Sequence, residues 1–360
     1  MNFEIPEKMK ALVLFGPNDF RVVNDKPVPK PGPGEVLVKV EACGICGTDV
    51  KIITKGMPKM PPYGQFTQGH EWAGTVVALG ETVDEFKIGD RVAIEAHKGC
   101  GRCQNCIEGM YTSCLNYGQK GQIASGMTRD GGFAEYAVHH INSVYKIPDN
   151  VSFVDATYVT TLGCALWALD MSGGFIAGDT VLITGPGPIG LSMVQACKAV
   201  GAEKIILTGT KNDRLAIGRE VGATHTINVN EVEDPLAEVM KITEGRGCER
   251  TYECAGTDEA FDLCLRSTMR GHVMTCVSFY KKPVTAALDY AVLNGINIMT
   301  VRGEGRNNCK RALSLMSQGR IQTKNIITHT FPLDDFATAY DYFVNRRDGA
   351  MKVVVLPQGK

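Results

Sequence analysis

The sequence lacks an excess of charge of either sign: its 360 residues hold 38 Lys and Arg against 39 Asp and Glu, a formal net charge of −1. A chain without a basic surplus is not expected to bind nucleic acid or a membrane surface. It also lacks an apolar run of the roughly 18 residues that a membrane helix needs. The first segment carries Glu4, Glu7 and Lys8 where a signal peptide would be apolar. We therefore expect a cytoplasmic protein.

Cysteine, in contrast, is abundant. An odd total of 13, clustered in part, favours thiols and metal ligands over disulfides in a cytoplasmic chain. The length suggests two domains, each able to bury its own core. The chain has no internal repeat that would suggest a different architecture.

The two halves of the chain differ in pattern. The first 150 residues hold short β-favouring runs broken by Pro and Gly. From about residue 155, strand-like and helix-like segments alternate, which predicts a parallel sheet covered on both faces, in a doubly wound α/β fold. The predicted strands are 180–184, 204–208, 250–254 and 272–277, and the predicted helices begin near 189, 212 and 258. In the last 60 residues we predict one helix, 307–318, and a short strand, MKVVVL.

A glycine-rich loop follows the strand TVLIT directly and runs into a helix. Its sequence is Gly185-Pro186-Gly187-Pro188-Ile189-Gly190, which fits G-x-G-x-x-G. The first glycine permits a tight turn, the second lets the backbone approach a pyrophosphate, and the third lets helix and strand pack closely. Because the helix N-terminus offers free N–H groups to phosphates, this context predicts dinucleotide binding rather than an ordinary turn.

The acidic residue that usually holds the adenosine ribose of NAD is missing. Counting along the second strand leads to Gly209, followed by Thr210, Lys211 and Arg214, which could receive a 2′-phosphate. The sequence therefore favours NADP over NAD. The alternative is that the two cations are solvated and that NAD binds through other contacts.

Four thiols lie within a short segment, at Cys100, Cys103, Cys106 and Cys114. Four soft ligands at this spacing suit a closed tetrahedral zinc site, and the metal could replace a missing local core. Disulfides and a nucleic-acid-binding zinc ribbon are alternatives. The segment has few aromatics and no strong basic run, which disfavours the ribbon.

A second, open metal site is suggested by Cys46 and His70. A thiolate and an imidazole are good zinc ligands, and a catalytic zinc needs three protein ligands and one open position. Taken singly, such residues are more often packing residues than ligands.

Taken together, these motifs resemble the zinc-containing medium-chain alcohol and polyol dehydrogenase superfamily. GICGTD, GHEWAGTVVALG, GDRV, the four cysteines, GPGPIG and MKVVVL occur in the expected order over essentially the whole chain. The resemblance implies a GroES-like, distorted β-barrel catalytic domain over 1–155 and 296–360, with the zinc lobe near 97–116. A Rossmann domain over 156–295 interrupts it.

The resemblance also implies roles for single residues. Cys46 and His70 match catalytic zinc ligands, and Glu71 matches a carboxylate that approaches or supports the metal. Thr48 matches the hydroxyl that takes the substrate proton, and Asp49 matches a residue that orients the His70 ring. The implied reaction is hydride transfer from a zinc-bound alkoxide to a nicotinamide.

The third zinc ligand departs from the family pattern. Relatives place Cys or Glu where the alignment puts Thr160, and a threonine hydroxyl is a poor zinc ligand. Cys164 follows about one helical turn later. Glu71 and Cys164 remain equal candidates, with Thr160 holding a water as a lesser one. Cys164 could also be a buried packing residue.

The second departure is Lys51, where relatives often carry a histidine that ends the proton relay. Lys51 could move protons if its pKa were lowered, or it could contact a cofactor phosphate or an anionic substrate. It could also be a solvated lysine. Together with Arg306 it keeps an anionic substrate open.

We therefore expect a zinc-dependent, NAD(P)-linked dehydrogenase with one structural and one catalytic zinc ion, acting on a secondary alcohol, polyol or hydroxy acid. The resemblance leans toward the threonine and sorbitol dehydrogenase branch and implies a homodimer or homotetramer. A zinc-free reductase of enones or quinones is one alternative. A protein that binds the cofactor without turnover is another.

Overall fold

The computed structural model describes residues 3–174 and 177–359 of the chain. The chain forms two compact units, which we call the barrel unit (Met1–Thr160, Gly303–Ser317 and Thr323–Lys360) and the sheet unit (Thr161–Arg302 and Gln318–Gln322). The sequence analysis places the second boundary at 296. The structure places it later, because the strand Asn297–Thr300 belongs to the large parallel sheet.

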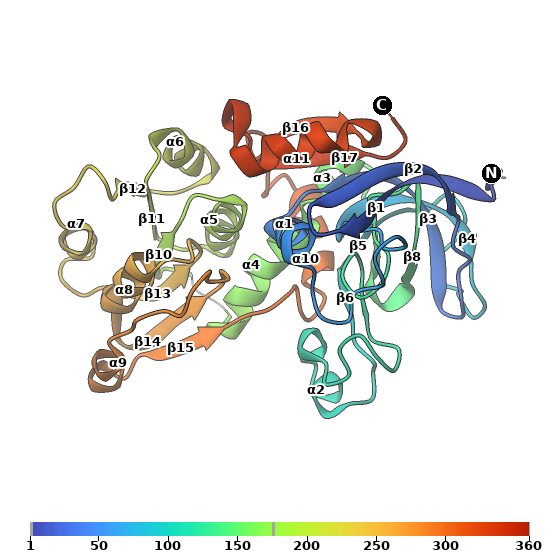
Figure 1. Cartoon of the computed structure of the whole chain (residues 1–360). Coiled ribbons are helices and arrows are strands. Elements are labelled where there is room, and N and C mark those ends of the chain that lie inside the picture. The colour runs from blue at the N-terminus through green and yellow to red at the C-terminus, as the bar shows by residue number, and fades with distance from the viewer. Residues whose placement is uncertain (1–2, 175–176, 360) are drawn as a thin grey trace. The chain divides into compact units, whose positions relative to one another are not determined.

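A seven-stranded sheet frames the barrel unit (Figure 1). Its strands are β3 (Glu35–Gly44), β4 (Glu71–Leu79), β5 (Arg91–Ile94), β8 (Tyr136–His140), β9 (Val144–Lys146), β16 (Ile327–Pro332) and β17 (Lys352–Leu356). The order is β16-β17-β3-β4-β5-β9, with β8 also paired to β3, and only β16 and β17 run parallel. Val36 and Val38 of β3 enter one apolar core while Leu37 enters another, as the alternation of side chains in a strand requires.

The barrel unit also contains two antiparallel sheets of two strands each, β1 (Lys8–Gly16) with β2 (Asp19–Pro27) and β6 (His97–Lys98) with β7 (Ile123–Ala124), and several helices. The helices are α1 (Gly47–Lys55), α2 (Gln104–Ile107), α3 (Phe153–Ala156), α10 (Asn308–Ser317) and α11 (Phe336–Asn345), with 3₁₀ turns at Tyr111–Ser113, Ile141–Ser143, Leu333–Asp335 and Arg347–Gly349. The helix α4 (Val159–Met171) begins in this unit and continues into the sheet unit.

Two elements near the C-terminus were missed by the sequence analysis, β16 and α11. The sequence of α11 is rich in aromatic and short polar residues, which have modest helix propensity. The helix is stabilised by tertiary packing instead, because Phe336 meets Phe133 at 4.9 Å and Phe20 at 5.4 Å between ring centroids.

The sheet unit is built on six parallel strands in the order β12-β11-β10-β13-β14-β15. The strands are β10 (Thr180–Thr184), β11 (Lys204–Gly209), β12 (His225–Asn228), β13 (Cys248–Glu253), β14 (Thr268–Cys276) and β15 (Asn297–Thr300), and the helices are α5 (Pro188–Val200), α6 (Asn212–Val221), α7 (Pro235–Ile242), α8 (Asp258–Ser267) and α9 (Leu288–Asn294). With β10 counted as the first strand, this is the dinucleotide-binding order, which confirms the doubly wound prediction.

Helices cover both faces of this sheet. Figure 1 shows α5 and α6 against one face and α7 and α8 against the other. The buried residues of β10, Val181, Leu182 and Ile183, form a continuous apolar run, as expected of a parallel strand covered on both sides. No helix among the described residues is long and apolar enough to cross a membrane.

Candidate active site

The first group of potential metal ligands begins where β3 leads into α1. Cys46 is the N-cap residue of α1, and its backbone N–H donates to Asp49 Oδ2 at 2.8 Å. The preceding residue, Ile45, donates its N–H to the carbonyl of Val353 in β17 at 2.8 Å. These bonds fix the Cys46 thiol at the N-terminus of α1.

Strand pairing brings the second and third members of this group to Cys46. In the antiparallel pair β3 and β4, Glu71 lies opposite Gly44, so the start of β4 adjoins the end of β3. Gly69 makes the turn into β4 with φ +96°, and a Cβ there would stand 2.7 Å from Cys43 Sγ. As a result, potential ligand atoms of Cys46, His70 and Glu71 lie within 4.8 Å of one another.

Asp49 supports the histidine of this group. Its fully buried carboxylate places Oδ1 3.3 Å from His70 Nδ1. Burial by itself lowers the pKa of His70, but the Asp49 carboxylate outweighs it, with a further contribution from Cys46, and the pKa is raised well above its usual value. With Nδ1 held by Asp49, Nε2 is the nitrogen left for a metal.

Lys352 is a member of this site that the sequence analysis missed. It opens β17, is 2% exposed, and its Nζ forms an ion pair with Glu71 Oε2. Burial by itself lowers the pKa of Lys352. The negative charges of Glu71 and then Cys46 raise it by more than burial lowers it, so the net shift of the pKa is upward. The sequence did hold a signal for this residue, since Lys352 opens a continuous apolar strand. Lysine is almost never fully buried unless it is paired, so a lysine at this position indicates a buried acidic partner.

The donor set of this group fits zinc. One sulfur, one imidazole nitrogen and one carboxylate oxygen, all largely screened from solvent, match the ligands of open zinc sites. Thr48 lies half-buried in the first turn of α1, and Lys51 is exposed one turn later.

The other two candidate ligands lie on α4. Thr160 Oγ1 is buried and makes no hydrogen bond to any described residue. Cys164 lies one turn further along, in the sheet unit, and is not part of the group formed by Cys46, His70 and Glu71.

The four cysteines of the predicted zinc lobe converge. Their sulfur atoms lie within 4.8 Å of one another, with 4.0 Å between Cys100 and Cys106 and 3.8 Å between Cys103 and Cys114. A tetrahedron with Zn–S bonds of about 2.3 Å has sulfur–sulfur edges of about 3.8 Å, so the group fits zinc. Backbone N–H donation from Arg102, and then the Asn116 side chain, lower the pKa of Cys100 to about 5, which favours the thiolate.

In the sheet unit the glycine loop has the geometry of a phosphate site. Gly185 has φ +84°, and a Cβ on Gly190 would stand 1.9 Å from the Gly185 carbonyl oxygen. A Cβ on Gly187 would meet nothing within 4 Å, so a ligand can approach the backbone there. Gly187 caps α5 without a side-chain bond, and Pro188 is the first helical residue, followed by Ile189. The loop therefore fits a dinucleotide pyrophosphate.

The segment after β11 carries the residues predicted to select the cofactor. A Cβ on Gly209 would stand 2.5 Å from Pro186, which places the end of β11 beside the glycine loop. Thr210 and Lys211 are exposed and Arg214 is half-buried. Lys211 is the N-cap residue of α6.

A separate cluster of buried acids lies in the barrel unit. Glu95 is fully buried, and its Oε2 accepts a hydrogen bond from Tyr145 at 3.0 Å. Nearby, His97 Nδ1 lies 3.3 Å from Glu304 Oε2. Burial, and then the Glu304 carboxylate, raise the pKa of Glu95 to about 8. The folded chain therefore holds a proton on Glu95 at neutral pH that the unfolded chain releases.

Glu95 is expected to make stability depend on pH. The pKa of Glu95 is about 8 in the folded chain and 4.5, the ordinary value, in the unfolded chain. The free energy of unfolding therefore falls as the pH rises from about 4.5 to 8, and it levels off above pH 8. Glu95→Gln removes this dependence, so its stability relative to the parent should increase by about 2–3 kcal/mol between pH 5.5 and 8.5.

Unfolding midpoints of both chains across this pH range measure the effect of Glu95→Gln. Glu81→Gln, at an exposed position, is the control. A constant difference between Glu95→Gln and the parent at all pH values would contradict this account.

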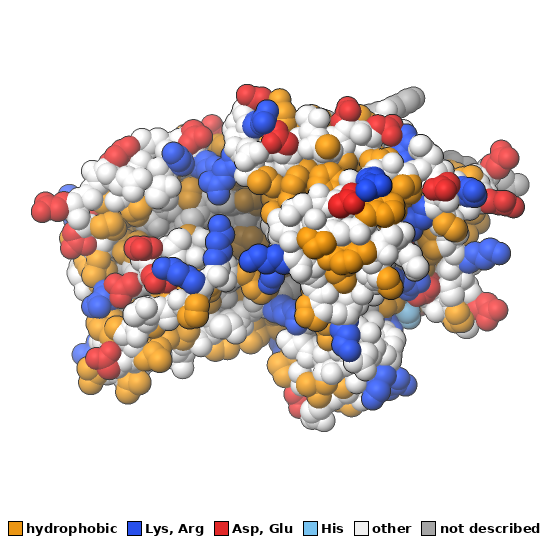
Figure 2. All heavy atoms as spheres, viewed as in Figure 1, with side chains coloured by type: hydrophobic (Ala, Val, Ile, Leu, Met, Phe, Trp, Pro, Cys, Tyr) orange, Lys and Arg blue, Asp and Glu red, His pale blue; other side chains and the backbone are white. Residues whose placement is uncertain are grey.

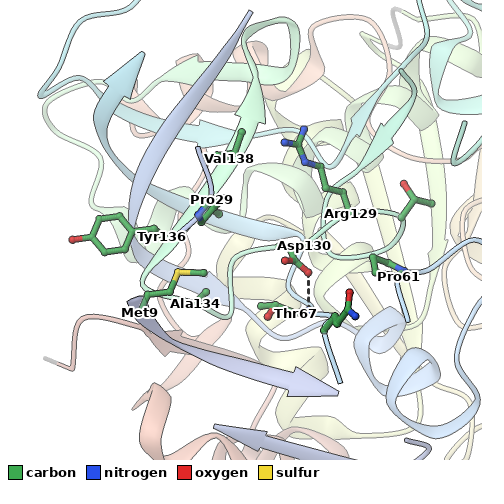
Figure 3. Close-up of a pocket in the computed structure, with 13 residues that line it drawn as sticks. Met9, Pro29, Pro61, Thr67, Arg129, Asp130, Ala134, Tyr136 and Val138 are labelled. Atoms are coloured by element: carbon green, nitrogen blue, oxygen red, sulfur yellow. Dashed lines mark hydrogen bonds between the residues drawn. The ribbon is translucent and has the colours of Figure 1, made fainter. Parts of the chain in front are cut away.

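The barrel unit also contains a cavity of about 270 Å³, lined by 13 residues (Figure 3). Its charged groups are already paired, Arg129 with Glu35 and Asp130 with Lys26, and Asp130 also accepts from the Thr67 N–H at 2.9 Å. None of the residues that line it belongs to either metal group. The cavity is therefore not the centre of the chemistry.

A doubly wound sheet with a G-x-G-x-x-G loop, in one chain with two groups of potential metal ligands, is typical of a metal-dependent dehydrogenase that uses a dinucleotide. Comparison with known proteins agrees with this class. Residues 32–149 match the alcohol dehydrogenase GroES-like domain, and residues 188–318 match the zinc-binding dehydrogenase family. The chain belongs to the zinc-containing medium-chain dehydrogenase family, as the sequence analysis predicts, and is an oxidoreductase of the alcohol and polyol class.

Two curated relatives match over nearly the whole chain. Sorbitol dehydrogenase of Bacillus subtilis is 33% identical over 99% of both chains. The L-threonine 3-dehydrogenase of Pectobacterium carotovorum is 32% identical over 95% of this chain and 97% of its own.

Two solved structures agree. A putative zinc-binding dehydrogenase of Sinorhizobium meliloti bound to NADP is 31% identical, with a TM-score of 0.86 over 98% of this chain and 100% of its own. An Escherichia coli alcohol dehydrogenase complexed with NADH is 28% identical, with a TM-score of 0.87 over the same shares. The GroES-like and Rossmann fold prediction is thus confirmed.

Proposed function

We propose that this chain oxidises a secondary alcohol group of a polyol or hydroxy acid, and reduces the carbonyl in reverse, with NADP as the preferred cofactor. The observation that carries the proposal is the group of Cys46, His70 and Glu71 at the N-terminus of α1. The family match supports this reading over a zinc-free reductase.

The metal site is proposed to use three protein ligands, Cys46, His70 and Glu71. A zinc ion there supplies a Lewis acid for the alcohol oxygen. Glu71 is preferred to Cys164 as third ligand because its carboxylate lies within 4.8 Å of the other two donors. The buried Thr160 hydroxyl, which makes no hydrogen bond to a described residue, supports a role in holding a water.

Two other residues of α1, Thr48 and Lys51, are proposed to move the proton that the alcohol releases. Thr48 receives it from the alcohol, and Lys51, three residues later on the same helical face, passes it outward. Asp49 keeps His70 Nδ1 protonated and fixes the ring. The alternative role of Lys51 is to hold an anionic group on the substrate instead of moving the proton, and Arg306 is a second candidate for that role; both side chains are exposed.

The cofactor preference is proposed from the segment after β11. Thr210, Lys211 and Arg214 offer a hydroxyl and two cations for a 2′-phosphate. The relative bound to NADP supports this choice, and the relative complexed with NADH shows that the family also accommodates the other cofactor.

The proposal is tested by kcat/KM with NADP and NAD on sorbitol, L-threonine and a panel of related diols and hydroxy acids. We expect turnover of a secondary alcohol and a higher kcat/KM with NADP. Lys211→Ala should reduce the ratio of kcat/KM with NADP to kcat/KM with NAD about tenfold. The reason is that the proposed partner of the Lys211 ammonium is the 2′-phosphate, which only NADP carries. A clear preference for NAD would overturn the NADP assignment, and enone reduction without alcohol turnover would overturn the reaction.

A homodimer or homotetramer is proposed from the surface of the sheet unit. Leu288, Val292 and Leu293 of α9 are 58%, 80% and 75% exposed, and Figure 2 shows hydrophobic side chains at the surface over this helix. The adjoining β15 ends the sheet. An apolar patch beside an open strand edge favours self-association, which sedimentation equilibrium measures. None of the 13 cysteines, all of which lie in the described part of the chain, is in a disulfide, which supports a reducing, cytoplasmic location that fractionation tests.

A further inference from the structure

Glu253, the last residue of β13, is fully buried and holds together several segments at the carboxyl edge of the parallel sheet. Its Oε1 accepts hydrogen bonds from the backbone N–H groups of Ala255 and Gly256, both at 2.8 Å. Its Oε2 accepts from the Tyr280 hydroxyl at 2.6 Å and from the Ser278 hydroxyl. One carboxylate therefore joins the loop after β13 to the loop after β14.

The same carboxylate also reaches the strand that leads into the glycine loop. Thr184, the last residue of β10, lies beside Glu253 in the ladder, and its hydroxyl donates to Oε1 at 3.4 Å. Gly185 follows at once, and a Cβ on it would stand 3.0 Å from the Cα of Ala255. The turn fixed by Glu253 thus forms the packing surface of the first glycine of the phosphate loop.

The two loops joined by Glu253 also pack on each other. Gly256 has φ +75°, and a Cβ there would stand 3.0 Å from the carbonyl oxygen of Phe279. The backbone N–H of Val277 donates to the carbonyl of Glu253 at 2.9 Å. In open parallel sheets the ligand binds outside the carboxyl ends of the strands, which is the edge that these loops form.

Among the described residues, the groups that hydrogen-bond to the Glu253 carboxylate are all donors, which suits a group that only accepts. A buried polar network with all members satisfied holds its segments in one arrangement. We infer that Glu253 is a positioning residue for the dinucleotide: its carboxylate sets the Gly185 turn and the loops after β13 and β14 relative to one another, and so sets cofactor affinity. This inference rests on the proposed function for the identity of the ligand.

Glu253→Gln tests this inference with little change of volume. The amide can still accept from Ala255 and Gly256 through its oxygen, but its NH₂ then faces two hydroxyls that were donors. The measurement is the Kd of NADPH and NADH by fluorescence titration, together with the unfolding temperature and zinc content of the protein without cofactor. We expect the Kd to rise about tenfold with zinc content unchanged.

Glu249→Gln is the matched control, because Glu249 lies in the same strand as Glu253. Its Oε2 accepts a hydrogen bond from the Thr180 N–H at 2.9 Å, at the amino ends of the strands and therefore away from the proposed dinucleotide site. This variant should lower the unfolding temperature without changing the Kd. Tyr280→Phe and Ser278→Ala each remove one donor to Oε2 and should raise the Kd by a smaller factor. They carry the test if Glu253→Gln does not fold.

The inference is overturned if the Glu253 and Tyr280 variants bind both dinucleotides as the parent does, or if Glu249→Gln weakens binding to the same extent. A parent chain that binds neither dinucleotide would instead overturn the proposed function, and this inference with it.

Discussion

Cys46→Ser is expected to remove one zinc ion per chain and to lower kcat/KM by about a thousandfold or more. A Lewis-acid metal stabilises charge by several kcal/mol, and a thousandfold corresponds to about 4 kcal/mol. Cys46 is the sulfur donor of its group, and a serine hydroxyl at the N-cap of α1 still serves the helix. The fold should therefore persist while metal and activity are lost.

Metal content per chain and kcat/KM of Cys46→Ser, on protein purified without chelator, measure this directly. Cys43→Ala is the control, because Cys43 is a buried thiol three residues earlier that is not in the metal group. It should keep both zinc ions. One zinc ion per chain in the parent, unchanged in Cys46→Ser with full activity, would show that only the four-cysteine lobe binds metal, and zinc catalysis would be abandoned.

Cys103→Ser is expected to have the largest effect on stability, with loss of the other zinc ion and unfolding of the segment around 97–116. Structural zinc sites contribute on the order of 10 kcal/mol of binding energy to folding. Cys103 and Cys106 are only partly buried, and the short helix α2, which Cys103 caps and which includes Cys106, contains no buried residue. Without the metal this lobe has little apolar core to maintain its fold.

The unfolding temperature, the zinc content and the rate of proteolytic cleavage within the lobe measure the effect of Cys103→Ser. Cys46→Ser provides the reciprocal control, since it should lose a zinc ion without exposing the lobe to cleavage. The double variant should lose both ions. A Cys103→Ser chain with two zinc ions and the parent's resistance to cleavage would refute a structural metal there.

The metal groups illustrate two degrees of predictability. The four cysteines are close in sequence, so short chain segments are enough to bring them together, and spacing alone predicts the group. His70 and Glu71 approach Cys46 only through the register of β3 and β4. Their assignment therefore needed the family resemblance, and Lys352, which comes from the far end of the chain, was missed.

The sequence by itself determined the doubly wound unit, the glycine loop and the cysteine lobe, because each depends on local periodicity, local glycine conformation or short ligand spacing. The tertiary structure decided the helix α11, the position of the second boundary, the grouping of Glu71 with Cys46, and the contacts of Lys352 and Glu253. These features depend on side chains that meet across strands and loops distant in sequence. Their stability comes from packing, ion pairs and hydrogen bonds that form only once the sheets are assembled.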